Sequence, residues 1–239
     1  MRIAAIDAST ITAGVALWED GEICYEALSV NGMTHSQTLM PMVAEAMNRI
    51  EWKPQTVDAY AAVNGPGSFT GIRIGVATAK GLAEAARALT VGVNTLETLA
   101  FGLFSRDWIL PVLDARRGQV YTGLYKWIGN DLIEEIPPMA CAWEEMAEYL
   151  PKGKTIILCG DGAKTFLDAF SEKHSGKVLL PPVNQRLQRA SSCAILAAKK
   201  LAAGEGMDAA QLTPFYLRAS SALTTAQRAA AGIGKTGKR

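Results

Sequence analysis

The segment NGPGSFTGIRIGVATAKGLA, residues 64–83, joins a predicted strand to a predicted helix through a turn that is rich in glycine. The apolar run VDAYAAVN before the turn is typical of a buried strand, and the sequence after residue 70 is typical of a helix. One face of this helix carries almost no side chain, because small residues recur there at four-residue steps. These residues are Gly71, Gly75, Ala79 and Ala83.

The sequence on either side of this segment completes one half of a pattern. Three short apolar runs in residues 2–30 predict a meander of three strands. A helix is expected over residues 34–50, where apolar residues recur at three- and four-residue spacing and form one face. The helix after the glycine turn should end near residue 87, and TVGVN at residues 90–94 predicts a closing strand.

The same order of elements starts again at residue 108. WILPVLDA predicts a strand that ends in an acid, and two more strands are expected at residues 118–127 and 131–136. A helix at residues 142–150, a strand that enters the turn GDGA, and a helix at residues 163–173 follow. This half is less regular, because LLPPVNQR interrupts it before a last helix at residues 191–204.

Overlaying the halves places Asp7 against Asp114, each at the end of a first strand, and the turn of residues 65–67 against that of residues 160–162. We therefore predict a duplicated α/β fold of two βββαβα lobes, the second reduced. The lobes should span residues 1–104 and 105–218. The basic tail, residues 219–239, is rich in Ala, Ser, Thr and Gly, a composition typical of disorder.

Composition limits the kinds of partner. The 239 residues are 49% hydrophobic and 20% charged, which is ordinary for a folded protein of one or two lobes. The formal net charge of +1 gives the whole molecule no electrostatic reason to bind a polyanion. Any role on nucleic acid is therefore expected to be shared with another protein.

The cysteines and histidines show no grouped spacing. Four single cysteines and two histidines make a zinc site and a disulfide framework improbable. An acid at residue 7 comes too early for a signal peptide, and no apolar run approaches 18 residues. These features predict a cytoplasmic, reduced protein that does not enter a membrane.

Both glycine turns and both first-strand ends would face one cleft in such a duplicated fold. Glycines let a backbone approach phosphates, and carboxylates can hold Mg²⁺ through water, so the cleft suits a nucleotide. The alternative is that Asp7 and Asp114 only cap tight turns. The candidate nucleotide residues are Asp7, Ser9, Thr10, Gly65, Gly67, Asp114, Gly160 and Gly162.

Catalytic motifs are missing from the sequence. The glycine stretch ends without the Lys-Ser or Lys-Thr pair of a P-loop, and the chain has neither a nucleophile elbow nor a His-Glu-x-x-His helix. His35 is expected to cap a helix or make a surface contact, and His174 to mark a charged helix end. No catalytic residue and no metal ligand is assigned.

The bare helix face has two interpretations. Glycine inside a helix costs about 1 kcal/mol relative to alanine, so tight packing against another backbone must compensate. That backbone belongs either to the chain's own sheet or to a second protein. In the second interpretation, the surface comprises Leu39, Met42, Val43, Met47, Gly71, Gly75 and Ala79.

Residues 64–83, followed by VGVNTLETLA, LPVLDARRGQVYTGLY and PFYLR, resemble the TsaB family, also called YeaZ, of the bacterial pathway to threonylcarbamoyladenosine in tRNA. The resemblance covers residues 1–218 and is most specific over residues 64–125. It implies the duplicated actin/Hsp70/sugar-kinase fold, which is ribonuclease H-like. That expectation agrees with the repeat.

The sequence departs from the catalytic relative TsaD at two positions. TsaD carries an Asn-His-x-x-x-His metal motif, and the matching run here is VNTLETLA. Thr95 and Leu99 stand in the histidine positions, and neither side chain is a useful metal ligand. The resemblance thus implies a scaffold without the catalytic centre.

The resemblance also implies a function and partners. TsaB-like proteins pair with TsaD through N-lobe helices, and with the ATPase TsaE the complex transfers threonylcarbamoyl to N6 of adenosine 37 in tRNAs that read codons beginning with A. This subunit itself needs no cofactor, since ATP and Mg²⁺ are used by the complex, and tRNA is reached indirectly. Self-association is expected when TsaD is absent. The alternative is a stand-alone ATP-dependent phosphotransferase that uses the Asp7 and Asp114 cleft.

Overall fold

The computed structural model describes residues 1–30 and 35–217. The first lobe is built on a five-stranded sheet with the order β3-β2-β1-β4-β5. β1 pairs antiparallel with β2, and β2 with β3, whereas β4 and β5 continue the sheet in parallel. The strands are β1 (Arg2–Asp7), β2 (Ala13–Glu19), β3 (Glu22–Ser29), β4 (Ala59–Gly65) and β5 (Leu89–Asn94).

The second sheet repeats this topology. Its order is β8-β7-β6-β9-β10, with antiparallel pairing among β6, β7 and β8 and parallel pairing of β9 and β10. The predicted duplication is therefore confirmed strand by strand. The strands are β6 (Trp108–Arg116), β7 (Gln119–Ile128), β8 (Asp131–Ala142), β9 (Ile156–Cys159) and the short β10 (Val178–Leu179).

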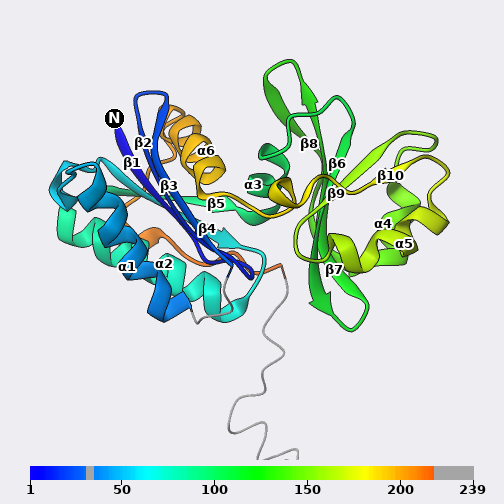
Figure 1. Ribbon diagram of the computed structural model, residues 1–239, viewed down its shortest axis with the longest axis horizontal. Helices are drawn as coiled ribbons and strands as arrows, with labels where there is room; N and C mark the ends of the chain where they lie inside the picture. Colours follow the sequence, from blue (N-terminus) through cyan, green and yellow to red (C-terminus); the bar gives the residue numbers. More distant parts are fainter. Residues whose placement is uncertain (31–34, 218–239) are drawn as a thin grey trace, which may run out of the picture.

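Two helices cover the outer face of each sheet. α1 (His35–Arg49) and α2 (Phe69–Ala86) lie side by side on the first sheet, and α4 (Trp143–Tyr149) and α5 (Ala163–Lys173) cover the second (Figure 1). α2 begins where the Ser68 hydroxyl accepts a hydrogen bond from the Gly71 N–H at 3.2 Å. The four helices agree with those predicted from the apolar spacing.

The last helix of each repeat packs on the sheet of the other repeat. α3 (Thr95–Phe101) follows the first sheet but packs against β6 and β7, with Leu96, Leu99 and Ala100 in the second lobe's inner core. α6 (Ala190–Ala202) follows the second sheet but packs against β1 and β2. Figure 1 shows α6 on the face of the first sheet opposite α1 and α2. The two lobes thus exchange helices.

This exchange corrects the predicted organisation in two respects. Each repeat has the order βββαβαβα rather than βββαβα, because β5 and β10 each add a fifth strand and α3 and α6 each add a third helix. The predicted division at residue 104 also assigns α6 to the second lobe, whereas its apolar face completes the core of the first. The predicted disordered tail, residues 219–239, lies outside the described residues.

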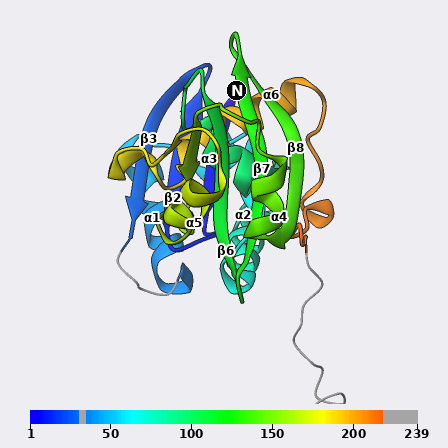
Figure 2. The ribbon, with the colours of Figure 1, turned by 90° about the vertical axis from the view of Figure 1, so that its right-hand side faces the viewer.

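The C-terminal segment, residues 206–217, returns along the first lobe. The Thr90 N–H donates to the Met207 carbonyl at 2.8 Å, and the Met207 N–H donates back at 3.0 Å, so this segment pairs with the free edge of β5. Further on, the Phe215 N–H donates to the Asn64 carbonyl at 2.7 Å. In Figure 2 the segment runs down one side of the molecule, away from β3.

Three short 3-10 helices complete the described part of the fold: η1 (Pro54–Thr56), η2 (Val183–Gln185) and η3 (Ala209–Gln211).

Among the residues that the structure describes, no helix is both long and apolar enough to pass through a lipid bilayer.

Candidate functional site

The turn after β1 holds three of the predicted nucleotide residues. Asp7 ends β1 and is 1% exposed, and its Oδ1 accepts hydrogen bonds from the Ser9 N–H at 2.9 Å and the Ser9 hydroxyl at 2.7 Å. Nε2 of His35, in the first turn of α1, lies 2.8 Å from the Thr10 carbonyl oxygen. His35 is therefore a contact between helix and turn, in agreement with its predicted structural role.

A residue from the other end of the chain fills this turn. The Gln188 side chain, 1% exposed, donates from Nε2 to the Ser9 hydroxyl oxygen at 3.4 Å and to the Thr10 hydroxyl oxygen. Gln188 lies just before α6, so 179 positions of sequence separate it from Ser9. No motif or local spacing in the sequence marks this residue, because only the fold brings it to the turn.

The glycine turn after β4 packs on the chain's own backbone. Gly65 and Gly67 have φ of 124° and 152°, values at which a side chain is strained, and the Gly65–Pro66 bond is cis. A β-carbon on Gly67 would overlap the Ser9 carbonyl, which already accepts the Ser68 N–H at 2.7 Å. A β-carbon on Gly65 would overlap the Phe215 carbonyl. These glycines therefore permit close packing inside the chain.

The second repeat reproduces the arrangement at its own turns. Asp114 Oδ1 accepts the Arg116 N–H at 2.7 Å, and its other oxygen forms an ion pair with the Arg116 guanidinium at 3.3 Å. The Gly160 N–H donates to the Arg186 carbonyl at 2.6 Å, and the Gly162 N–H donates to the Val112 carbonyl at 3.0 Å. Both aspartates thus cap their turns, as the simpler alternative predicted.

Two carboxyl groups at these turns, the buried Asp7 and the half-buried Asp161, form no ion pair among the residues that the structure describes. Burial raises the pKa of Asp7, although the hydrogen bonds from Ser9 oppose this effect, and its Oδ2 has no hydrogen-bond partner. Burial also raises the pKa of Asp161, whose Oδ1 is likewise unpartnered. Within residues 1–30 and 35–217, no group of three or more His, Cys, Asp or Glu side chains is placed to hold a metal ion.

Four backbone N–H groups at these turns are not free to bind a phosphate. A phosphate needs free backbone donors. The N–H groups of Ser9, Ser68, Gly160 and Gly162 are already paired within the chain. The structure therefore brings the predicted residues of each turn together. The backbone N–H groups of Ser9, Ser68, Gly160 and Gly162, however, donate to other atoms of the chain.

Two further predicted positions lie in the core. Thr95 and Leu99, the positions that the resemblance aligned with the expected metal motif, belong to α3 and are 0% and 2% exposed. His174 follows α5 and is 8% exposed, with Nε2 2.8 Å from the Lys154 carbonyl oxygen. His174 is therefore buried at the helix end rather than exposed there.

Most residues of the predicted partner surface pack within the chain. The bare face of α2 packs on the turn after β1: a β-carbon on Gly71 would overlap the Ala8 carbonyl, and one on Gly75 would lie 3.6 Å from the Ala8 β-carbon. The apolar face of α1 packs on the same sheet, beside α2. Six of the seven predicted residues are buried, because the spacing that suits a partner also suits the chain's own sheet: Leu39, Val43, Met47, Gly71, Gly75 and Ala79. Met42 is half-buried.

The outer face of α1 and α2 presents a different small-residue surface. Gly81 lies in the middle of α2, and a β-carbon placed there would meet no atom within 4 Å. Ala77 and Ala85 are exposed on either side of it, and Met40 on α1 is 45% exposed. We call these four residues, together with the exposed Ala44, the outer helix surface. None of them carries a charge.

An aromatic cluster borders the first turn of α2. The rings of Phe69 and Tyr216 stack with centroids 5.4 Å apart. The Arg73 guanidinium lies 3.9 Å above the Phe69 ring and donates from Nε to the Tyr216 hydroxyl at 2.9 Å. Phe69 and Tyr216 are 42% and 41% exposed, so the cluster presents aromatic surface where the C-terminal segment meets α2.

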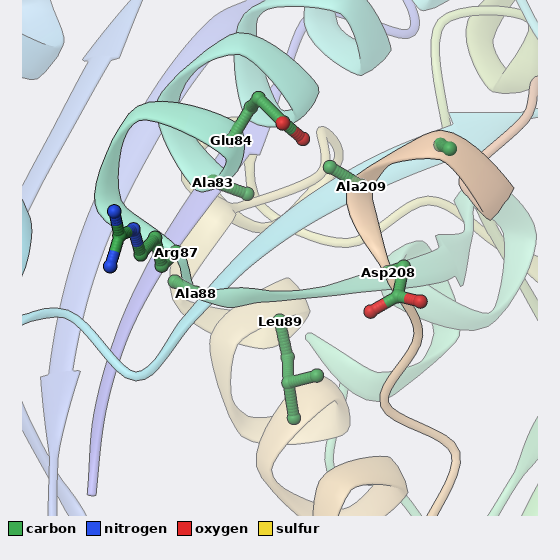
Figure 3. Close-up of a pocket in the computed structure, with 8 residues that line it drawn as sticks. Ala83, Glu84, Arg87, Ala88, Leu89, Asp208 and Ala209 are labelled. Carbon is green, nitrogen blue, oxygen red and sulfur yellow. The ribbon is translucent and has the colours of Figure 1, made fainter.

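A hollow at the other end of α2 has no convergent polar groups. It measures about 300 Å³ and lies between the end of α2 and the C-terminal segment. Figure 3 shows that the charged groups of Arg87 and Asp208 point to opposite sides of it. This hollow is therefore a poor candidate for a binding site.

The matched strand orders, the paired glycine turns and the two capping aspartates place the chain in the duplicated actin/Hsp70/sugar-kinase fold class. A family model described as "TsaD: tRNA N6-adenosine threonylcarbamoyltransferase" matches residues 30–226. The tRNA threonylcarbamoyladenosine biosynthesis protein TsaB of Bacillus subtilis is 35% identical over 227 residues, covering 93% of this chain and 96% of that protein. Its Escherichia coli namesake is 32% identical over 231 residues, with 91% and 95% covered.

A solved structure agrees with these relatives. YeaZ from Pseudomonas aeruginosa superimposes with a TM-score of 0.77 at 26% identity, covering 90% of this chain and 99% of that one. The chain belongs to the TsaB (YeaZ) family.

Proposed function

We propose that the chain is a non-catalytic subunit of the machinery that attaches threonylcarbamoyl to N6 of adenosine 37 in tRNA, and that it acts by binding and activating TsaD. Family membership supports the pathway, since the Bacillus and Escherichia relatives are named for threonylcarbamoyladenosine biosynthesis. TsaE and tRNA then join through the complex, which uses ATP and Mg²⁺. Without TsaD, the same surface pairs two copies of this chain.

The observation that carries this proposal is the open position of Gly81. An exposed glycine in a helix costs about 1 kcal/mol relative to alanine. At Gly71 the chain's own packing accounts for the glycine, because a β-carbon would overlap the Ala8 carbonyl, but at Gly81 no atom of the described residues lies near enough to require one. A helix of another protein that crosses α2 closely would account for it. We therefore place the TsaD contact on the outer helix surface rather than on the buried face.

The surroundings of Gly81 suit such a contact. Ala77 and Ala85 would let a second backbone approach, and Met40 on α1 offers a flexible apolar side chain. The aromatic cluster of Phe69, Arg73 and Tyr216 continues the surface at the start of α2. Aromatic residues and arginine are common among the residues that dominate interface energies.

The test is co-purification with tagged TsaD. Gly81→Leu adds a side chain that has room in the free chain but would hold a partner helix away, so we expect binding to fall roughly tenfold or more with a Tm no lower than that of the native chain. Ala202→Leu is the matched control, because Ala202 is an exposed residue at the end of α6, on the opposite face of the first sheet. Equal binding by both variants would refute this surface.

The stand-alone phosphotransferase is the less supported function. It requires a nucleotide site, and the backbone N–H groups of Ser9, Ser68, Gly160 and Gly162 already form hydrogen bonds within the chain. Isothermal titration of the free chain with Mg-ATP distinguishes the two functions, since a phosphotransferase must bind the nucleotide. Phosphotransfer by the purified chain would establish the alternative.

A further inference from the structure

Several polar groups of the turn after β1 are paired within the chain, although Asp7 Oδ2 and Gln188 Oε1 are buried without a hydrogen-bond partner. The Ser9 N–H and hydroxyl both donate to Asp7, and the Ser9 carbonyl accepts from Ser68. The Ser9 and Thr10 hydroxyl oxygens accept from Gln188. A neutral carboxamide therefore lies against the hydroxyl groups of two of the residues that the sequence assigned to a nucleotide cleft.

The backbone around Gln188 is anchored to the first lobe on its C-terminal side. Glu26 on β3 accepts hydrogen bonds from Arg189 Nε at 3.0 Å, from the Ser191 N–H at 3.0 Å and from the Ser191 hydroxyl at 2.8 Å. On the N-terminal side, the Arg186 carbonyl accepts the Gly160 N–H of the second lobe at 2.6 Å. Gln188 therefore lies on a short link that is bound to the glycine turn of one repeat and to the sheet of the other.

We propose that Gln188 is an interlobe latch: its carboxamide binds the Ser9 and Thr10 hydroxyl groups at the turn after β1, the link that carries it joins the two repeats, and this arrangement leaves the free chain without a nucleotide site at this turn. The inference does not depend on the proposed TsaD contact, which lies on the outer helix surface. Each can fail separately, because the latch is tested on the isolated chain.

The buried carboxyl group of Asp7 determines which substitution at position 188 tests the latch. His35 of α1 and Cys193 of α6 are the other titratable groups whose charges act on Asp7, and Gln188 is the polar group next to it. Asp7 is fully buried and has no ion pair in the part of the chain described. A second carboxylate at position 188 would therefore be repelled by Asp7 and would lack the N–H donors that bind Ser9 and Thr10.

The first experiment compares Gln188→Glu with Gln185→Glu. Gln185 is an exposed glutamine three residues earlier whose side chain has no hydrogen bond within residues 1–30 and 35–217, so it controls for the added charge. We expect Gln188→Glu to lower the Tm by roughly 5 °C or more relative to the control. The loss should be greater at pH 8 than at pH 5, where the carboxyl groups are closer to protonation.

A second substitution tests whether Asp7 causes the loss. Asp7→Asn keeps an oxygen acceptor for Ser9 and removes the negative charge, so Asp7→Asn combined with Gln188→Glu should recover part of the lost Tm and abolish most of the pH dependence. A purely steric role of Gln188 predicts no such rescue. Equal Tm values for Gln188→Glu and Gln185→Glu would overturn the latch.

The native chain provides the independent measurement. Titration with up to several millimolar Mg-ATP should give no heat and no rise in Tm. A saturable rise in Tm that Asp7→Asn weakens would show a nucleotide at this turn and would overturn the proposal. If neither Gln188 variant folds, this titration alone decides between the two outcomes.

Discussion

Gly75 on α2 lies directly over Ala8, and a β-carbon built on the glycine would be 3.6 Å from the β-carbon of the alanine. The helix therefore rests on the turn after β1 with no side chain longer than a methyl group between them. A methyl group would fit here at ordinary contact distance, so the contact favours a small residue, and it distinguishes the covered Gly75 from the open Gly81.

Gly75→Leu should destabilise the isolated chain, because a leucine would be forced into a closely packed contact. Overpacking of this kind costs about 1 to 3 kcal/mol. Gly81→Ala should instead raise the free energy of unfolding by up to about 1 kcal/mol, since the position is helical and open. Urea unfolding of the two variants measures both changes. Equal destabilisation by both would contradict the different packing of the two glycines.

Glu26 should stabilise the fold in a pH-dependent way. Burial raises its pKa, but the hydrogen bonds from Arg189 and Ser191 outweigh burial, so the net pKa is lowered. Because the folded pKa lies below the unfolded value of about 4.3, the stabilisation is present above that pH and is lost as the pH falls through the folded pKa. Glu26→Gln should cost about 1 to 2 kcal/mol at pH 7. The difference from the native chain should shrink below pH 4, as measured by urea unfolding at both pH values.

The cysteines should differ in reactivity toward a thiol reagent. Cys24 is exposed, whereas Cys141, Cys159 and Cys193 are buried and free. Burial raises the pKa of Cys141 to about 11 and raises the pKa values of Cys159 and Cys193 as well, which lowers their thiolate fraction further. Ellman's reagent should therefore titrate one thiol in the native protein at pH 8 and four in guanidinium chloride. Rapid reaction of two or more native thiols would contradict the burial.

Lys80 should hold the C-terminal segment against α2. Its Nζ donates to the Ala210 carbonyl at 3.1 Å and to the Leu212 carbonyl at 3.0 Å. Lys80→Met should release the segment, so that chymotrypsin cleaves near Phe215 several times faster than in the native chain. Lys152→Met, at an exposed lysine outside this segment, is the control. Identical cleavage rates in both variants would show that Lys80 does not restrain the segment.

The sequence predicted the strands and the duplication because both depend on local pattern. Apolar runs marked every strand except the two-residue β10, and Asp7 and Asp114 aligned because each caps the turn after a first strand. α3 was missed as a helix because its seven residues span only two turns, too few for a clear periodicity. No local sequence pattern indicated that α3 would pack on the second sheet or α6 on the first.

The candidate site was harder to predict because its contacts are distant in sequence. Small residues at four-residue steps indicate close packing but not the identity of the neighbour, so Gly75 was assigned to a partner although Ala8 covers it. The exposed Gly81 belongs to the same segment and has the same sequence signal. No sequence pattern marks Gln188, because its role depends on hydrogen bonds to Ser9 and Thr10, which are distant in sequence.

The helix exchange also governs how the chain can be made and divided. The first sheet is made from residues 2–94, but one of its faces is covered by α6, at residues 190–202. During synthesis this face is therefore uncovered until α6 has been made. A fragment cut after Phe104 would expose Ile3, Val91 and Val93, and the remaining fragment would lack Leu96 and Leu99 over its own sheet. We therefore expect that neither half folds stably when it is expressed as a separate protein.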